Sequence, residues 1–186
     1  MPSIPVERLD CEHAQLLVID IQERLLPSIA EHAAVLAQAE RMIQAAAALE
    51  VPITVSEQYP RGLGATVPGI VAAARGAERL QKMTFSVCAD AAGRERISAL
   101  GRPQVLIVGI EAHVCVYQTA LDLLSVALRP VVLADAVGSR RPLDCTIALD
   151  GLRTAGVTIT TVESAIFQLV YEAGTERFRR ILPIVR

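Results

Sequence analysis

The sequence predicts a three-layer α/β/α sandwich around a central, mainly parallel sheet, and three observations point to this fold. Short apolar runs rich in β-branched residues alternate along the chain with longer segments in which apolar residues recur at helical spacing. The short runs are almost continuously apolar, as expected of strands that are covered on both faces. Hydrophobic residues make up 52% of the 186 residues but aromatic residues only 3%, so aliphatic side chains must fill the core of a single domain spanning residues 1–186.

The first half of the chain gives the elements in order. The apolar run at residues 15–21 predicts a strand, and the helical spacing over residues 33–50 predicts the helix that follows it. Residues 51–57 predict a second strand, and the Pro- and Gly-rich residues 58–69 predict a long surface loop. Residues 79–86 fit a strand and a loop equally well.

The second half continues the alternation. Residues 87–100 predict a helix for which Ser86 is the candidate N-cap. Three more strands are predicted, at residues 103–110, 129–137 and 156–164. Helices are predicted between them, at residues 113–128 and 142–155, and Gly156 is a natural left-handed cap for the second helix.

Charge and composition exclude several classes of partner. The net charge of −2 gives no basic footprint for a nucleic acid or an anionic membrane. Residues 1–15 show no secretory signal, and no apolar run approaches the roughly 20 residues of a membrane helix. The four cysteines lack the paired spacing of a zinc or dithiol motif. We therefore expect a cytoplasmic protein that acts on a small molecule without a cofactor.

Three side chains of chemical interest lie at predicted strand ends. Asp20 ends the first strand, Cys115 follows the strand at residues 103–110, and Lys82 lies in the ambiguous segment. Open parallel sheets bind ligands at the carboxyl ends of their strands, so the topology brings these groups to one edge. The pattern alone also allows an inert buried cysteine, an aspartate that caps the next helix and a solvated lysine.

Three short segments resemble the signatures of the isochorismatase-like cysteine hydrolases. They are VIDIQ at residues 18–22, LQKMTFS at 80–86 and GIEAHVCVYQTA at 109–120, in the order found in that family. The similarity extends over almost the whole chain and is greatest to the small single-domain branch, whose substrates are mostly unassigned. The resemblance implies the isochorismatase-like hydrolase fold, which is Rossmann-like, and assembly as a homo-oligomer.

The resemblance also assigns catalytic roles. It makes Cys115 the nucleophile, Asp20 the acid and base, and Lys82 the group that balances charge. A neighbouring ammonium group and a helix N-terminus would lower the pKa of the thiol. The family places a cis peptide bond at Ile110–Glu111, and the amides of Glu111 and Cys115 would form an oxyanion hole.

Substrate-binding residues are less sharply indicated. Gln22, Tyr59 and Phe85 lie in segments that line the pocket in relatives, although each also suits a core position. Tyr117 follows the nucleophile by two residues and can face either way along the helix. The basic segment at residues 139–141 suits a solvated loop or a subunit contact better than an anion site.

The histidines decide the expectation about metal. The nicotinamidase branch holds zinc through an aspartate and histidines in the loop after its second strand, and the corresponding loop here has no histidine. The chain's three histidines, His13, His32 and His113, lack a ligand spacing. We expect no metal in catalysis.

These observations together predict a hydrolase. A retained cysteine nucleophile favours attack on an acyl carbon, so we predict cleavage of a C–N bond in a small amide, ureide or carbamoyl-type substrate through a thioester. The alternatives are a catalytically silent binding or scaffold protein, an isochorismatase-type vinyl ether hydrolase, and a redox sensor at Cys115.

Overall fold

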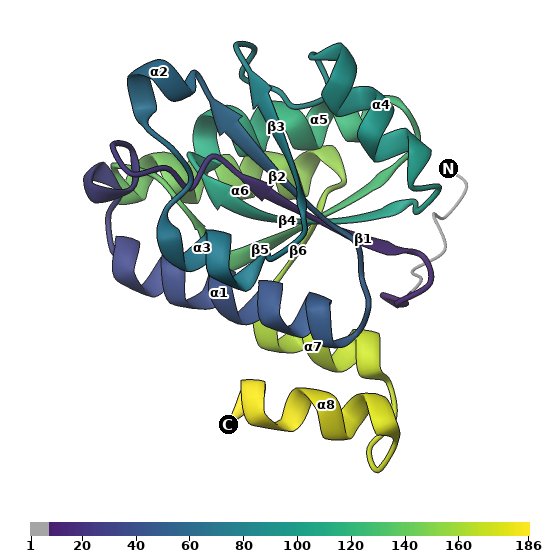
Figure 1. Cartoon of the computed structure of the whole chain (residues 1–186). Helices are drawn as coiled ribbons and strands as arrows, with labels where there is room; N and C mark the ends of the chain where they lie inside the picture. The colour runs from purple at the N-terminus through teal and green to yellow at the C-terminus, as the bar shows by residue number, and fades with distance from the viewer. Residues whose placement is uncertain (1–7) are drawn as a thin grey trace.

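The computed structural model describes residues 8–186, which contain one parallel sheet with helices on both faces (Figure 1). The strands are β1 (Ala14–Ile19), β2 (Ile53–Gln58), β3 (Glu78–Lys82), β4 (Gln104–Ile110), β5 (Arg129–Gly138) and β6 (Thr158–Thr160). They pair in the order β3-β2-β1-β4-β5-β6. The predicted α/β/α sandwich is confirmed. The single-domain boundary stays a prediction, and residues 1–7 of the segment searched for a signal lie outside the described residues.

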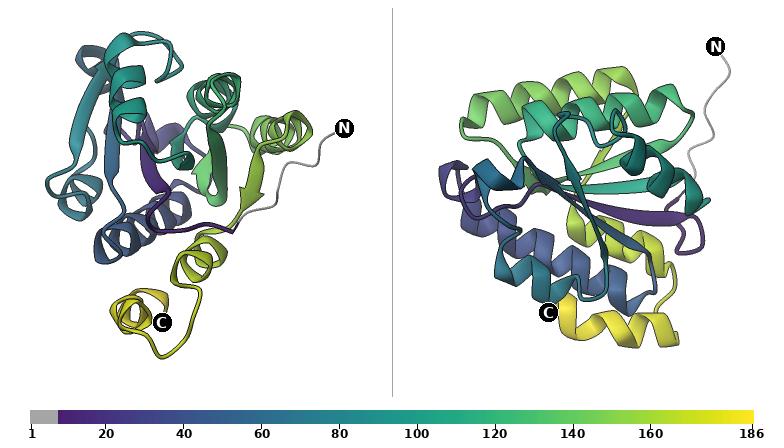
Figure 2. Two further views of the ribbon diagram at one scale, coloured as in Figure 1. Left: turned by 90° about the vertical axis from the view of Figure 1, so that its right-hand side faces the viewer. Right: turned by 45° about the horizontal axis from the view of Figure 1, so that its top comes forward.

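Helices form the two outer layers (Figures 1 and 2). One face of the sheet is covered by α1 (His32–Ala48), α3 (Pro68–Ala73) and α7 (Val162–Val170), and α8 (Glu176–Val185) packs outside α1 and α7. The other face is covered by α4 (Ala91–Ala99), α5 (Tyr117–Ser125) and α6 (Pro142–Ala155), and the short helix α2 (Pro60–Leu63) follows β2. Within residues 8–186, none of the helices has the length and apolar character needed to cross a bilayer.

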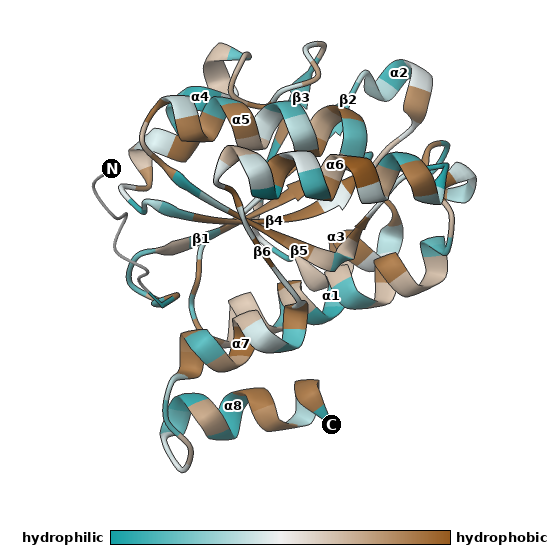
Figure 3. Cartoon of the chain, turned by 180° about the vertical axis from the view of Figure 1, so that it is seen from behind, coloured by the Kyte–Doolittle hydropathy of each residue, from teal (hydrophilic) through white to brown (hydrophobic). Residues whose placement is uncertain are grey.

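The strand β1 shows how the sequence builds two cores. Its successive side chains point to opposite faces. Leu16 and Val18 join the hydrophobic cluster beneath α1 and α7, whereas Leu17 and Ile19 join the cluster beneath α5 and α6. The central strands β4 and β5 are coloured hydrophobic along most of their length, while the covering helices alternate between hydrophobic and hydrophilic colours (Figure 3). A strand buried on both faces therefore reads as a continuous apolar run.

Two predicted segments have a different structure. The expected long loop after β2 contains two short helices, which begin at Pro60 and Pro68. Proline suits the first helical turn because its fixed φ matches the helix and its missing N–H has no partner there. The predicted strand at residues 156–164 keeps only the three residues of β6, and α7 begins at Val162.

The expected N-cap of α4 is wrong. Asp90 caps this helix, because its carboxylate accepts hydrogen bonds from the amides of Ala92 at 3.0 Å and Gly93 at 3.4 Å. Ser86 instead accepts a hydrogen bond from the amide of Cys88 at 3.1 Å, within the turn that precedes the helix. The predicted cap at Gly156 is confirmed, with φ of 99°.

The strand order reverses direction between β1 and β4. From β1 the chain continues to β2 and β3 on one side, and β4, β5 and β6 then extend the sheet on the other side. Loops that leave neighbouring strands in opposite directions open a crevice at the carboxyl edge of the sheet. Asp20 follows β1 and Cys115 follows β4, so both lie at this edge of the sheet.

Candidate active site

Asp20 is fixed by its backbone and by its side chain. It has φ of 53°, a left-handed conformation that Asp tolerates better than most residues. Its amide donates to the carbonyl of Ser56 at 3.1 Å, and the Ser56 hydroxyl donates to Oδ1 of the carboxylate at 2.7 Å. The side chain is fully buried, so the orientation of the carboxylate is set by these contacts and by one cation.

That cation is Lys82, at the end of β3. Its Nζ donates to Oδ2 of Asp20 at 2.7 Å and to Oε1 of Gln58 at 2.8 Å. The carbonyls of Thr84 and Phe85 accept from the same ammonium at 3.3 and 3.0 Å. The side chains of Lys82 and Asp20 are 1% and 0% exposed. Burying two charges is costly unless they are paired and hydrogen-bonded, and both conditions hold here.

Gly109 allows the nucleophile loop to approach Asp20. It pairs with Ile19 in the register of β4 against β1. A β-carbon at Gly109 would lie 2.1 Å from the carbonyl oxygen of Ile19, and the residue has φ of 132°. Only glycine fits this position without displacing β4 from β1. The close approach brings the turn after β4 next to the residue after β1.

Cys115 lies in that turn, a π-helical segment (Ala112–Val116) that leads into α5. Burial raises the pKa of its thiol to about 12, and the charge of Asp20 and a hydrogen bond to Asp20 act in the same direction. The charge of Lys82 and a hydrogen bond to it lower the pKa, but by less. The expectation of a thiol with a lowered pKa is therefore wrong for the resting site. The thiol stays protonated, with the buried Asp20–Lys82 pair beside it.

The chain between β4 and Cys115 has the backbone that the resemblance implies. The peptide bond Ile110–Glu111 is cis. The carboxylate of Glu111 is held by Arg140, whose Nη2 lies 2.6 Å from Oε1. In the basic segment at residues 139–141, Arg140 therefore binds a carboxylate of the protein itself, that of Glu111.

Two of the four proposed substrate residues lie near Lys82. Tyr59 and Lys82 both line a cavity of about 430 Å³ whose other walls come from the start of α2 and the residues around Met83. The side chain of Phe85 is 53% exposed, and its carbonyl accepts a hydrogen bond from Lys82. The exposed side chains of Tyr59 and Met83 supply apolar surface to this cavity, which Lys82 also lines.

Gln22 and Tyr117 lie elsewhere. The amide group of Gln22 is fully buried and donates to the carbonyls of Gln58 at 3.0 Å and Gly64 at 2.7 Å, so it connects the segment after β1 to β2 and the loop after α2. Tyr117 packs toward α6, where its hydroxyl oxygen is 2.9 Å from the position that a β-carbon on Gly151 would occupy. Their part in binding substrate stays a prediction.

Two residues of the site, Ser56 and Gln58, were not predicted from the sequence. Both contact the Asp20–Lys82 pair, and both lie in the last residues of β2. The signal was present, because three consecutive polar residues, Ser56 to Gln58, end β2 at the edge of the sheet where ligands bind. Polar residues at the carboxyl end of a buried strand need partners. Here Ser56 and Gln58 contact the Asp20–Lys82 pair, and Glu57 accepts hydrogen bonds from Thr66.

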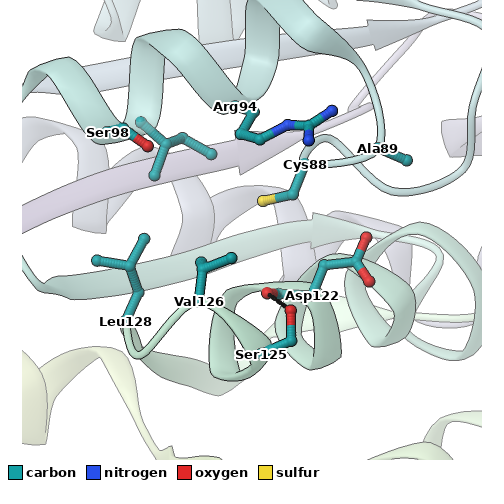
Figure 4. A pocket seen from close by; sticks show the side chains of 9 residues that line it. Cys88, Ala89, Arg94, Ser98, Asp122, Ser125, Val126 and Leu128 are labelled. Atoms are coloured by element: carbon teal, nitrogen blue, oxygen red, sulfur yellow. Dashed lines mark hydrogen bonds between the residues drawn. The ribbon is translucent and has the colours of Figure 1, made fainter.

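A second buried cysteine lies against a separate cavity (Figure 4). Cys88 points its sulfur into a space of about 260 Å³ between α4 and α5, with Arg94 on one wall and Asp122 on the other. Burial and the charge of Asp122 raise the pKa of this thiol to about 12, and Arg94 lowers it. The charges that act on Cys88 are thus not those of the candidate site.

Possible metal ligands are scattered. Within residues 8–186 there is no group of three His, Cys, Asp or Glu side chains that could hold a metal ion. Metal-independent catalysis stays a prediction.

The comparisons with known proteins assign the family. The sequence matches the isochorismatase domain over residues 14–164, a span that runs from β1 into α7 and contains Asp20, Lys82 and Cys115. The chain belongs to the isochorismatase family. It therefore has an isochorismatase-family hydrolase fold, as the sequence analysis predicts.

Individual relatives of this isochorismatase-family chain cover nearly its full length. Isochorismatase domain-containing protein 2A of Mus musculus is 39% identical over 175 residues, which cover 94% of this chain and 84% of the mouse protein. The MAR1 ribonuclease structure from Caenorhabditis elegans is 34% identical, with a TM-score of 0.91 and coverage of 96% of this chain and 92% of its own. The YcaC gene product of Escherichia coli, an octameric hydrolase of unknown specificity, is 22% identical, with a TM-score of 0.89 and coverage of 96% and 93%. At that identity the last comparison shows the fold alone.

Proposed function

We propose that this protein is a metal-independent cysteine hydrolase that cleaves a C–N bond in a small amide, ureide or carbamoyl-type substrate through a thioester. One observation carries the proposal: a buried ion pair between Asp20 and Lys82, with 2.7 Å between Nζ and Oδ2, acts on the thiol of Cys115. An acid, a base and a thiol together at the carboxyl edge of a parallel sheet are the parts of a nucleophilic hydrolase.

The protonated resting thiol favours a proton transfer that accompanies attack. Because the pKa of Cys115 is raised to about 12, little thiolate is present at neutral pH. Cys115 attacks the carbonyl carbon as its proton passes to the carboxylate of Asp20, and Lys82 stabilises the sulfur as it becomes negative. General base catalysis of this kind contributes about 10²- to 10⁴-fold to a rate.

Collapse of the tetrahedral intermediate completes the first half of the reaction. The amides of Glu111 and Cys115 would receive the carbonyl oxygen while it carries negative charge. The C–N bond breaks, and Asp20 returns its proton to the leaving nitrogen, which departs as ammonia or an amine. Asp20 then takes a proton from water, which attacks the thioester, and the acid leaves as the thiol regains its proton.

We propose a small acyl substrate rather than RNA, although the relative from Caenorhabditis elegans carries the name of a ribonuclease. The net charge of −2 offers little counterion release to a phosphate backbone. The apolar surface of Tyr59 and Met83 in the cavity lined by Lys82 suits an organic substituent of a small substrate.

A substrate screen tests the proposal. Ammonia release is measured over a panel of small primary amides, ureides and carbamoyl compounds, with labelled RNA and a vinyl ether assayed in parallel. We expect turnover of at least one C–N substrate by the wild type, none by Cys115→Ala, and a thioester adduct on Cys115 that hydroxylamine removes. RNA or vinyl ether cleavage without amide turnover would contradict the proposal, as would turnover by Cys115→Ala.

We also propose that the chain is a homo-oligomer and is cytoplasmic. The octameric YcaC gene product supports assembly, and Leu143 and Ile147 leave an apolar stripe on α6, at 69% and 63% exposed. All four cysteines are free thiols, which a reducing compartment maintains. Light scattering tests the assembly, and a stable monomer at micromolar concentration would contradict it.

A further inference from the structure

The carboxylate of Glu111 is bound by both the side chain and the backbone of Arg140. The Nε of Arg140 donates to Oε1 at 3.2 Å and to Oε2 at 3.1 Å, and its Nη2 donates to Oε1 at 2.6 Å. The backbone amide of Arg140 donates to Oε2 at 3.2 Å. The side chain of Glu111 is 6% exposed and that of Arg140 is 57% exposed. A planar guanidinium that binds both carboxylate oxygens fixes the orientation as well as the distance.

The backbone of the same residue controls the nucleophile turn. The carbonyl of Glu111 accepts hydrogen bonds from the amides of Val114 at 3.1 Å and Val116 at 3.2 Å. These two residues flank Cys115 in the sequence. A shift of Glu111 would therefore move the turn that carries the thiol and the amides around it.

A second pair of side chains connects the same two loops. The Nδ1 of His113 lies 2.9 Å from the hydroxyl of Ser139, and 3.9 Å from Oε2 of Glu111. Burial alone would raise the pKa of Glu111, but its hydrogen bonds to Arg140, with the charges of Arg140 and His113, lower it. The loop after β4 and the loop after β5 are thus joined through a carboxylate that stays ionised at neutral pH.

We propose that Arg140 is a positioning residue, which acts through Glu111 to hold the backbone amides after β4 where the oxyanion of the substrate develops. This inference rests on the proposed function. Arg140 itself takes no part in the chemistry, because its guanidinium binds the carboxylate of Glu111. Donors are effective when they lie about 2.7–3.1 Å from the oxyanion, so a displacement of a few tenths of an ångström in the turn lowers the rate before it lowers the stability of the fold.

Two thiol reagents separate this effect from simple thiol reactivity. Acrylamide adds to a thiol through an enolate-like transition state, which places negative charge on its carbonyl oxygen. Iodoacetamide is attacked at its methylene carbon and develops no oxyanion. The rate of each reagent at Cys115 is read by peptide mass spectrometry for the wild type, Arg140→Ala, Arg140→Lys and Arg141→Ala. Arg141 is the control because it is the exposed neighbour of Arg140 and lies outside the contact with Glu111.

We expect Arg140→Ala to slow acrylamide addition at Cys115 by about 10-fold or more and iodoacetamide alkylation by less than about 3-fold. Arg140→Lys, which keeps the charge but not the two-pronged geometry, should fall between, and Arg141→Ala should match the wild type. Added guanidinium ion at millimolar concentration should restore part of the acrylamide rate to Arg140→Ala. Thermal unfolding of each variant shows whether the fold is kept.

Three results would overturn the inference. Equal rates in Arg140→Ala and the wild type would show that the turn does not depend on the clamp. Equal slowing with both reagents would show that the clamp sets thiol reactivity rather than the oxyanion donors. A wild-type Cys115 that reacts with neither reagent would remove the proposed function together with this inference, which distinguishes that failure from the other two.

Discussion

Cys115 and Cys88 are two buried thiols of the same hydrophobic cluster, and burial raises the pKa of each to about 12. They differ in the charges beside them. Cys115 faces Asp20 and Lys82, which are buried, paired and hydrogen-bonded, whereas Cys88 faces Asp122 and the exposed Arg94 across an open cavity. Burial therefore favours the protonated form of both thiols, and under the proposed function only Cys115 has a proton acceptor and a cation beside it in a low dielectric.

The largest expected effect separates the two thiols directly. On the substrate found by the screen, Cys115→Ser should lower kcat by at least about 10⁴-fold, because the nucleophile is lost. Cys88→Ser should leave kcat within about 2-fold, since Cys88 belongs to another cavity. Steady-state kinetics of the two variants and the wild type measure these kcat values. Comparable losses in both variants would remove the distinction between the two sites.

The next effect concerns the charges beside Cys115. Lys82→Met leaves the fully buried Asp20 without its cation, which should cost about 3–5 kcal/mol of unfolding free energy. The matched control is Arg153→Met, since Arg153 pairs with Asp150 at 2.7 Å on a solvated surface, where a pair is worth about 1 kcal/mol or less. Urea denaturation measures both. A loss for Lys82→Met no larger than the control would mean that the pair is not truly desolvated.

A backbone change at Gly109 tests how the turn that carries Cys115 approaches Asp20. Gly109→Ala should cost about 3 kcal/mol, because the new β-carbon meets the carbonyl of Ile19 and the residue has φ of 132°. Gly101→Ala is the control: it has φ of 62° but open space around it, so its cost should be about 1 kcal/mol. Calorimetry gives the stabilities. Activity should fall in Gly109→Ala alone, and retention of full activity there would contradict the account of how β4 approaches β1.

The smallest effect is a pH dependence at Glu111. Its folded pKa is lowered, because the contacts with Arg140 outweigh burial. The stabilisation is therefore present above the unfolded pKa of about 4.3 and is lost as pH falls through the lower folded value. The wild type should exceed Glu111→Gln by about 1 kcal/mol near pH 7, and the difference should shrink below about pH 4. A difference that stays constant from pH 7 to pH 3 would contradict the assignment.

The sequence predicted most of the layered fold because buried parallel strands have a strong signal. Runs such as that of β4 are apolar on both faces, and strand-end residues share one edge, so Asp20, Lys82 and Cys115 could be expected together. Short elements were harder to predict. The edge strand β3 is largely exposed, and α2 and α3 are too short to show a period.

The misses in the site have a common physical origin. The direction of the Cys115 pKa depends on the balance of burial against two opposite charges, and sequence gives neither the depth nor the pairing of Lys82 with Asp20. The clamp of Arg140 on Glu111 joins residues 29 apart in the chain, through loops whose approach depends on the whole sheet. Such contacts have no local sequence pattern.

The most direct test of the central claim is to replace the proposed proton acceptor and follow both the thiol and the turnover. In Asp20→Asn burial still raises the Cys115 pKa, but the negative charge that adds to it is gone while Lys82 still lowers the pKa, so the pH profile of Cys115 alkylation should move below the wild type's pKa of about 12. Hydrolysis should nevertheless fall by about 10²- to 10⁴-fold, because no base remains. A thiol that becomes easier to ionise in a nearly inactive enzyme is the predicted result. Retained turnover, or an unchanged alkylation profile, would show that Asp20 is not the group that takes the proton from Cys115.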